Sequence, residues 1–257
     1  IVYDEQLALE GRARYYDKAG ALVDMIQSHL LQVMAVLAME PPVTLGATDV
    51  RGAKGKILRA THVFNDDPGA FSRRARYSAG TVSERRLGSY VDEPGVDPGL
   101  NTETLAEVTF GIDTWRWAGV PFTLRSGKAL ANRRREIVVT FKQVPHLPTG
   151  LSGLAAPTVL RIALAPDEMS LELNINGPGD PTVLKRVSLR ADFGPGQLLA
   201  YGEILSGILD GDPALSVRGD VAERCWHIVA PVLSAWREGA VPLAEYAAGS
   251  NGPHEWA

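Results

Sequence analysis

The dominant pattern in this 257-residue chain is an apolar stretch between residues 10 and 42. Across residues 22–37 the apolar positions recur at three- and four-residue steps, which is the spacing of an amphipathic helix. Across residues 30–39 nearly every side chain is apolar, so we expect this half of the helix to be buried on most sides. A Glu-Pro-Pro run ends it, because proline lacks a backbone donor. The pattern predicts a core helix whose first turns carry Asp24 and His29.

A second pattern, strict alternation of apolar and polar side chains, predicts strands. It occurs in five segments, at residues 104–112, 137–141, 160–164, 169–175 and 187–193. The connections between the later segments contain Pro-Asp or Gly-Pro-Gly-Asp-Pro, which favours hairpins and antiparallel pairing. A short strand is also expected at the start, over Ile1–Glu5.

The remaining segments show weaker patterns. Helices are expected at 197–209 and 220–236, and the residues after Gly239 are expected to form a loop. The arginine-rich segment Phe71–Gly95 is typical of a solvated arm or an irregular segment, because charge runs usually lie at the surface. A helix followed by a large, mostly antiparallel sheet and further helices indicates an α+β fold with helices packed on one face.

Composition narrows the function classes. A net charge of -4 argues against broad nucleic-acid binding, and 45% hydrophobic residues suit a protein with a sizeable core. The single cysteine, Cys225, excludes an internal disulfide, and the five histidines lack paired metal-ligand spacing, so we expect no metal site. No signal peptide and no membrane span of roughly 18 to 20 apolar residues is recognised. We therefore expect a cytoplasmic protein, and the missing initial methionine indicates a fragment.

Candidate chemistry lies first in the helix. Asp24 and His29 are five residues apart, so in an α-helix they lie roughly 140° apart around the axis and do not touch as a pair. A ligand lying across the first turns would contact both, and a neutral imidazole is suited to accept a proton near pH 7. The alternative is a core histidine bonded to a backbone carbonyl.

Two further candidates lie outside the helix. Glu5 stands where the first strand gives way to a loop, a common place for a ligand contact, although a solvated carboxylate would look the same. Lys128 follows a glycine in a basic segment and is expected to project from a loop at the sheet edge, where it would hold a phosphate or sugar hydroxyls. Its alternative is a basic turn in water. No phosphate loop or dinucleotide fingerprint is present.

Three segments carry a family resemblance. The run D-M-I-Q-S-H-L-L-Q from Asp24, with Y-Y-D-x-x-G before it and A-M-E-P-P after it, resembles the glucose-6-phosphate dehydrogenase family. Y-V-D-E-P-G-V at 90–96 and W-A-G-V-P-F-T-L-R-S-G-K-A-L at 117–130 match the same family in the same order. The resemblance covers residues 1–257, but only the family's C-terminal substrate-binding and dimerisation domain. The family's upstream Rossmann-type coenzyme domain is absent from this chain.

The resemblance implies a function. In this family glucose 6-phosphate is oxidised to 6-phosphogluconolactone with hydride transfer to NADP, in the first step of the pentose phosphate pathway, and the sheet forms the homodimer. The matching positions make His29 the general base, Glu5 and Asp24 acceptors for sugar hydroxyls, Lys128 a phosphate or hydroxyl contact and Arg133 a secondary contact. NADP would be bound mainly by the missing domain, so this piece alone is expected to be inactive.

The chain also departs from the family pattern. Ser28 replaces the usual asparagine, and Val23 stands where arginine is common. Arg125 and Arg134 match basic positions of a second, structural NADP site, whereas Ala163 falls where that site uses an arginine. Two alternatives to the enzyme remain: a non-catalytic paralogue that keeps the sheet for dimerisation, and a binding module for another sugar phosphate.

Overall fold

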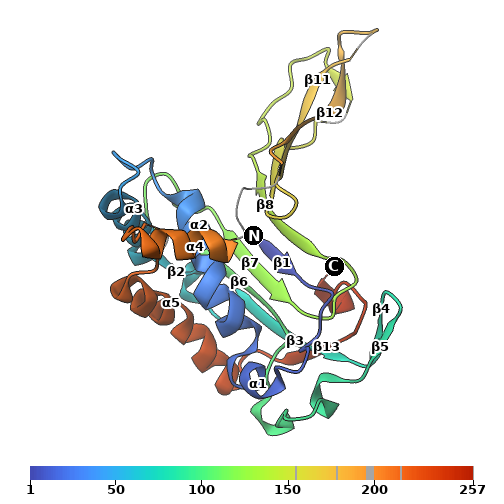
Figure 1. Ribbon diagram of the computed structural model, residues 1–257. Coiled ribbons are helices and arrows are strands. Elements are labelled where there is room, and N and C mark those ends of the chain that lie inside the picture. The colour runs from blue at the N-terminus through green and yellow to red at the C-terminus, as the bar shows by residue number, and fades with distance from the viewer. Residues whose placement is uncertain (154, 178, 195–199, 215, 257) are drawn as a thin grey trace. The chain divides into compact units, whose positions relative to one another are not determined.

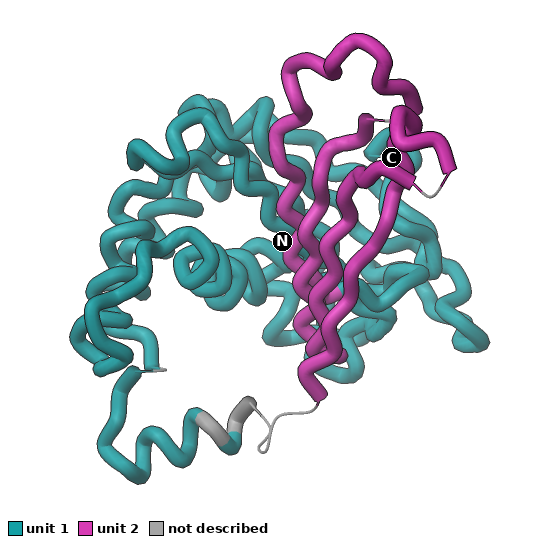
Figure 2. The backbone as a smooth tube through the Cα atoms, turned by 90° about the horizontal axis from the view of Figure 1, so that it is seen from above, with its two compact units in different colours: residues 1–134, 198–257 teal, residues 135–197 magenta. Residues whose placement is uncertain are grey.

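A computed structural model of the chain describes residues 1–153, 155–177, 179–194, 200–214 and 216–256 (Figure 1). It divides into two compact units, Ile1–Arg134 with Leu198–Ala257, and Arg135–Gln197 (Figure 2). Helices lie in the first unit and strands in both. The described strands form a mixed, mostly antiparallel arrangement, which confirms the α+β fold class.

In the first unit the strands run in the order β13-β3-β6-β7-β1, with β2 on β6. The pairs β3/β6, β6/β7 and β2/β6 are antiparallel, whereas β7/β1 and β3/β13 are parallel. The predicted strands at the start of the chain and at 104–112 are confirmed as β1 and β6. The bounds are β1 Val2–Asp4, β2 Thr61–Val63, β3 Ser72–Ser78, β6 Leu105–Ile112, β7 Phe122–Gly127 and β13 Leu243–Ala247, with a separate hairpin of β4 Gly80–Val82 and β5 Arg85–Leu87.

Two expectations for this unit were wrong. The arginine-rich segment is no solvated arm, because its first part is β3, with Ala75 and Tyr77 buried between the arginines. The residues after Gly239 are not all loop, because β13 pairs along β3 from Leu243 to Ala247. The β3 segment conceals its strand because its arginine side chains keep long apolar stems in the fold while their guanidinium groups find partners.

The predicted apolar helix is confirmed within a helical stretch of three parts: α1 Ala13–Ala21, which is broken at Gly20, the π-helix η1 Leu22–Leu30 and α2 Leu31–Ala38. Its apolar positions, among them Leu22, Ile26, Leu30 and Met34, lie in the main core cluster. η1 packs against β6, β7 and α5 (Gly219–Arg237), and α2 packs against α3 (Ala47–Arg59). α4 spans Ala200–Leu209, while the predicted residues 197–199 of this helix lie outside the described residues. Short 3-10 helices are η2 Phe64–Asp66, η3 Tyr90–Asp92, η4 Pro98–Leu100 and η5 His254–Trp256.

By length and composition alone, the stretch Ala13–Ala38 passes as a membrane-spanning helix, contrary to the sequence expectation. Half of its most apolar window is buried inside the protein. Its apolar side chains contact strands and helices of the same unit, so it serves as the core helix of this fold.

This core helix is interrupted at Gly20, whose φ of 66° and ψ of 177° fall in a region that essentially only glycine adopts. A Cβ atom built on Gly20 would lie 2.3 Å from Oε1 of Glu103. The break ends α1 and creates a new helix N-terminus at Leu22, with backbone N–H groups that need partners.

The second unit is a sheet with two different faces. Its strands run in the order β8-β10-β11-β12-β9, with bounds β8 Arg134–Thr140, β9 Ser152–Gly153, β10 Val159–Ala163, β11 Glu168–Asn176 and β12 Val183–Asp192. The pairs β8/β10, β10/β11 and β11/β12 are antiparallel, as predicted. Residues opposite each other share a face, so Val139, Leu160, Leu171 and Leu189 form one apolar row across four strands.

The other face of this sheet is polar. Arg161 lies 3.3 Å from Glu136 and 3.6 Å from Glu172, and Arg186 lies 3.3 Å from Glu172. Every residue of β10, β11 and β12 is at least partly exposed, and the Leu189 residue is 60% exposed. On the apolar face Ile175 and Leu189 are exposed, whereas Ile137 of β8 is buried.

Replacing Gly20 by alanine tests the helix break. We expect Gly20→Ala to lower the free energy of unfolding by about 2 kcal/mol or more, because alanine is strained at this φ and its Cβ meets the Glu103 carboxylate. The matched control is Gly52→Ala in α3, where an added Cβ meets nothing within 4 Å and the change should stabilise by about 0.5–1 kcal/mol. Urea unfolding of the full-length protein measures both; equal effects of the two variants would contradict the strained break.

Candidate functional site

The site begins where two parallel strands end together. β1 and β7 pair with Asp4 opposite Gly127, so the next residues, Glu5 and Lys128, leave the sheet side by side. The Glu5 N–H donates to the Gly127 carbonyl at 2.9 Å, and Lys128 Nζ lies 2.8 Å from Glu5 Oε2. Two of the predicted site residues are therefore joined in an ion pair.

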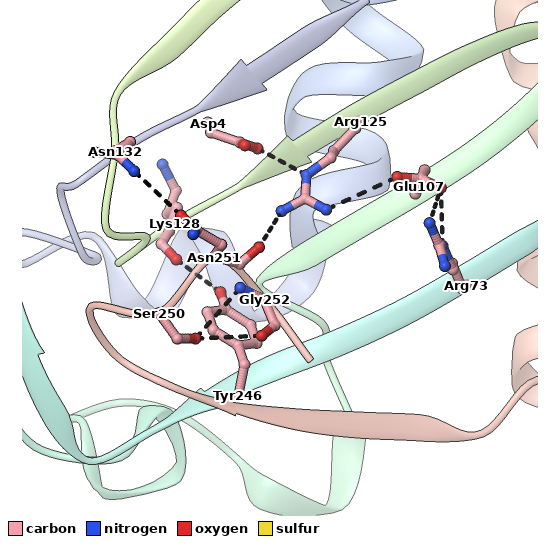
Figure 3. A network of polar contacts seen from close by, with 10 residues as sticks. All are labelled: Asp4, Arg73, Glu107, Arg125, Lys128, Asn132, Tyr246, Ser250, Asn251 and Gly252. Atoms are coloured by element: carbon pink, nitrogen blue, oxygen red, sulfur yellow. Dashed lines mark hydrogen bonds and ion pairs between the residues drawn. The ribbon is translucent and has the colours of Figure 1, made fainter. Parts of the chain in front are cut away.

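The sequence predicted that Lys128 projects from a loop at the sheet edge, and this prediction was wrong. Lys128 follows β7, which lies between β6 and β1, and its side chain is only 4% exposed. Its N–H donates to the Thr104 carbonyl at 2.9 Å, and the Tyr246 hydroxyl donates to its carbonyl at 2.7 Å (Figure 3). The ammonium lies 5.2 Å from the centre of the buried Tyr16 ring. The lysine is thus held at both its backbone and its side chain.

Helix η1 changes the expected relation between Asp24 and His29. It is π-helical, and the Leu31 N–H at its end donates to the carbonyl of Ile26, five residues back. In this geometry residues five apart lie about one turn apart on the same side of the helix. The prediction that Asp24 and His29 point well apart was wrong, because it assumed α-helical spacing. π-helical turns of this kind are frequent at functional sites.

Asp24 lies at the start of η1, close to two tyrosines. Its carboxylate raises the pKa of the Tyr15 hydroxyl, first through its negative charge. Burial raises the pKa of Tyr16 far above its ordinary value, with the charges of Glu103 and Asp24 among the smaller contributions. His29 is exposed on the same helix, so its ring can exchange protons with water.

Arg125, one of the two arginines predicted for a structural NADP site, is already bonded to other residues of the fold. Arg125 is 9% exposed, and its guanidinium donates to Asp4 Oδ1 at 3.1 Å and to the Asn251 carbonyl at 2.7 Å (Figure 3). Burial raises the pKa of the Asp4 carboxyl, and the Arg125 guanidinium opposes that rise. Arg125 is thus used within the fold, and Arg134 lies at the exposed start of β8.

Arg133 is exposed beside Arg134 in the segment before β8. The described residues also contain no group of three or more histidine, cysteine, aspartate or glutamate side chains arranged to hold a metal ion. The geometry therefore joins Glu5 and Lys128 at the ends of β1 and β7, and η1 packs against β7.

Sequence reasoning missed Glu103, which lies just before β6 and is 6% exposed. Its Oε1 accepts the Leu22 N–H at 2.9 Å, and its carbonyl accepts the Ala21 N–H at 3.3 Å. Burial raises the pKa of Glu103 to about 7, although the backbone donors and the charge of Arg74 lower it. Gly20, a glycine inside an otherwise helical pattern, was a signal that a helix could end there. The sequence does not show which residue accepts the backbone N–H groups of that helix end.

Comparison with known proteins places these features in a family. The sequence model of "Glucose-6-phosphate dehydrogenase, C-terminal domain" matches residues 1–257. The glucose-6-phosphate 1-dehydrogenase of Mycolicibacterium smegmatis is 40% identical over 261 residues, covering 98% of this chain and 52% of that protein. The Rhizobium meliloti enzyme of the same name is 38% identical over 265 residues, covering 99% of this chain and 53% of that protein.

Solved structures agree with the sequence matches. The crystal structure of glucose-6-phosphate 1-dehydrogenase from Mycobacterium avium superposes with a TM-score of 0.81 at 33% identity, covering 99% of this chain and 52% of that one. A glucose-6-phosphate dehydrogenase in complex with its substrate glucose 6-phosphate gives a TM-score of 0.84 at 28% identity, with the same coverage. The chain spans about half the length of the curated relatives it matches.

The buried carboxyl makes a prediction about pH. The pKa of Glu103 is about 7 in the folded protein, above the ordinary value of 4.5, so protonation favours the folded state. This contribution is fully present below about pH 4.5 and is lost as the pH rises through about 7, and amounts to on the order of 3 kcal/mol. Unfolding free energies of the full-length protein and its Glu103→Gln variant, compared between pH 4.5 and 8, should show wild type losing stability relative to the variant. A constant difference would contradict the raised pKa.

Proposed function

Because this chain belongs to the glucose-6-phosphate dehydrogenase C-terminal domain family, we propose that it supplies the sugar-phosphate site and the general base of an NADP-dependent glucose-6-phosphate dehydrogenase. The reaction is the oxidation of glucose 6-phosphate to 6-phosphogluconolactone. The observation that carries the proposal is the Glu5–Lys128 pair at the ends of β1 and β7, with η1 packed against β7.

The chemistry follows from the residue types. The substrate's C1 hydroxyl gives its proton to His29, whose exposed imidazole releases it to water in each turnover. NADP, held mainly by the part of the enzyme outside this chain, supplies the acceptor for the hydride of C1. Asp24 and Glu5 accept hydrogen bonds from sugar hydroxyls, which disfavours sugars that leave these carboxylates unpaired.

Lys128 provides positive charge for the phosphate or a nearby hydroxyl. Its ammonium is already desolvated and held by Glu5 at 2.8 Å, so little side-chain freedom is lost when substrate binds. Arg133, exposed after Lys128 in the chain, is a secondary contact in this proposal.

Replacing His29 tests the proposal directly. In the full-length enzyme His29→Asn should lower kcat by about 100-fold to 10,000-fold, the usual contribution of a positioned acid or base, with the KM for glucose 6-phosphate largely kept. The matched control is His227→Asn, an exposed histidine on α5 that should leave both constants unchanged. Steady-state kinetics with NADP provides the measurement.

Calorimetry should show that His29→Asn still binds glucose 6-phosphate. The wild type separates the alternatives: a full-length protein that binds no sugar phosphate would favour the non-catalytic paralogue, and one that binds another sugar phosphate but not glucose 6-phosphate would favour the binding module. Unchanged turnover in His29→Asn would rule out this residue as the base.

We also propose a homodimer formed through the sheet of the second unit. Support comes from its apolar face, where Leu171 and Leu189 form a cross-strand pair and Ile175 and Leu189 are exposed. Desolvating such a face on association is favourable, and a contiguous apolar patch is typical of an interface.

Leu189→Arg tests the dimer. A charge on the apolar face should shift the full-length enzyme from dimer to monomer at micromolar concentration, measured by light scattering after size exclusion. The matched control is Arg190→Gln, on the opposite face of the same strand, which should remain dimeric. A dimer unaffected by Leu189→Arg would place the interface elsewhere.

A further inference from the structure

The break at Gly20 leaves the second part of the core helix with a free N-terminus inside the protein. The first N–H groups of any helix lack partners within the helix, and buried ones must be satisfied from elsewhere. Here Glu103 supplies both partners: its carbonyl accepts from Ala21 at 3.3 Å and its Oε1 from Leu22 at 2.9 Å. The new helix start is therefore held by one residue from a distant part of the chain.

The carboxyl group is suited to this position by geometry. Glu103 is 6% exposed, and burial raises its pKa to about 7, although the backbone donors and the charge of Arg74 oppose that rise. Its oxygen accepts the Leu22 N–H whether or not the group is protonated, because a carboxylic acid keeps acceptor capacity. Gly20 leaves the space for this contact, because a Cβ there would lie 2.3 Å from Oε1.

Thr102 and Thr104, on either side of Glu103, make hydrogen bonds to α1 and to Lys128. The Thr102 hydroxyl donates to the Asp17 carbonyl at 2.6 Å, near the end of α1. The Thr104 carbonyl accepts the Lys128 N–H at 2.9 Å. Three consecutive residues thus contact the helix before the break, the helix after it and the backbone of the lysine.

Asp24 lies two residues beyond the contact of Glu103 with Leu22, and His29 lies one π-helical turn beyond Asp24. The rotation and height of η1 are set at its start, so a change there moves both side chains relative to Lys128. Errors of about 1 Å in such positions can lower catalysis by as much as 100-fold.

From this arrangement we infer that Glu103 is a positioning residue of the substrate site: by capping the start of η1 beside the backbone of Lys128, it sets where Asp24 and His29 meet the sugar. This inference rests on the proposed function. In this role Glu103 acts through the helix start that it caps.

The experiment uses the full-length enzyme with Glu103→Ala and Glu103→Gln. Alanine removes the acceptor, so kcat/KM for glucose 6-phosphate should fall by about tenfold or more, while the KM for NADP stays within about twofold of wild type. Glutamine keeps an amide oxygen that accepts the Leu22 N–H, so it should restore kcat/KM to within about threefold of wild type.

A control separates positioning from general destabilisation. Thr61→Val removes a buried side-chain hydrogen bond at the end of α3, from Thr61 Oγ1 to the Ile57 carbonyl at 2.9 Å, and should lower the melting temperature without changing kcat/KM. The inference is overturned if Glu103→Ala keeps wild-type kcat/KM, if Glu103→Gln loses as much as Glu103→Ala, or if Thr61→Val loses activity equally.

The outcomes also distinguish this inference from the function on which it rests. A wild-type enzyme that does not oxidise glucose 6-phosphate refutes the proposed function and this inference with it. An active wild type that loses turnover in His29→Asn but tolerates Glu103→Ala refutes the inference alone.

Discussion

The structure depends on the requirement that a helix starting inside a protein must have its first backbone N–H groups satisfied. The break at Gly20 creates such a start in the middle of the most apolar stretch of the chain. Without the break, a single straight helix would have to bury the turn that carries Asp24 or expose the apolar residues 30–39. With it, η1 begins with Asp24 partly exposed near the end of β7 while Ile26 and Leu30 enter the core.

Two of the segments that carry the family resemblance also form hydrogen bonds to this helix. Tyr90 donates its hydroxyl to Asp17 at 2.5 Å, which joins the second segment to the helix before the break. Trp117 donates its ring N–H to the Ala38 carbonyl at 2.8 Å, which caps the last turn of α2. The third segment then continues to Lys128. Tyr90 and Trp117 therefore have structural roles, because the hydroxyl and the ring N–H that these residue types provide each donate a hydrogen bond to the helix or its side chains.

Periodicity was sufficient where neighbours in sequence decide the structure. The core helix, β6 and the antiparallel strands of the second unit follow from apolar spacing alone. It failed where a distant partner decides. β3 is rich in arginine and looked solvated, but Arg74 donates to the carbonyls of Trp236 and Val241, far along the chain. The role of Glu103 likewise depends on a contact between segments about 80 residues apart, which single-sequence spacing does not encode.

The two-faced sheet has a consequence for how stability is measured. Its polar face is laced with ion pairs such as Arg161–Glu172, which contribute little each because they are exposed to solvent. Leu160 and Leu171 on the other face contribute fully only when another surface excludes water from them. If that surface is a second copy, unfolding couples to dissociation, and the melting temperature rises with protein concentration by mass action. Dilution would then lower the stability of the second unit, although every contact within one chain stays the same.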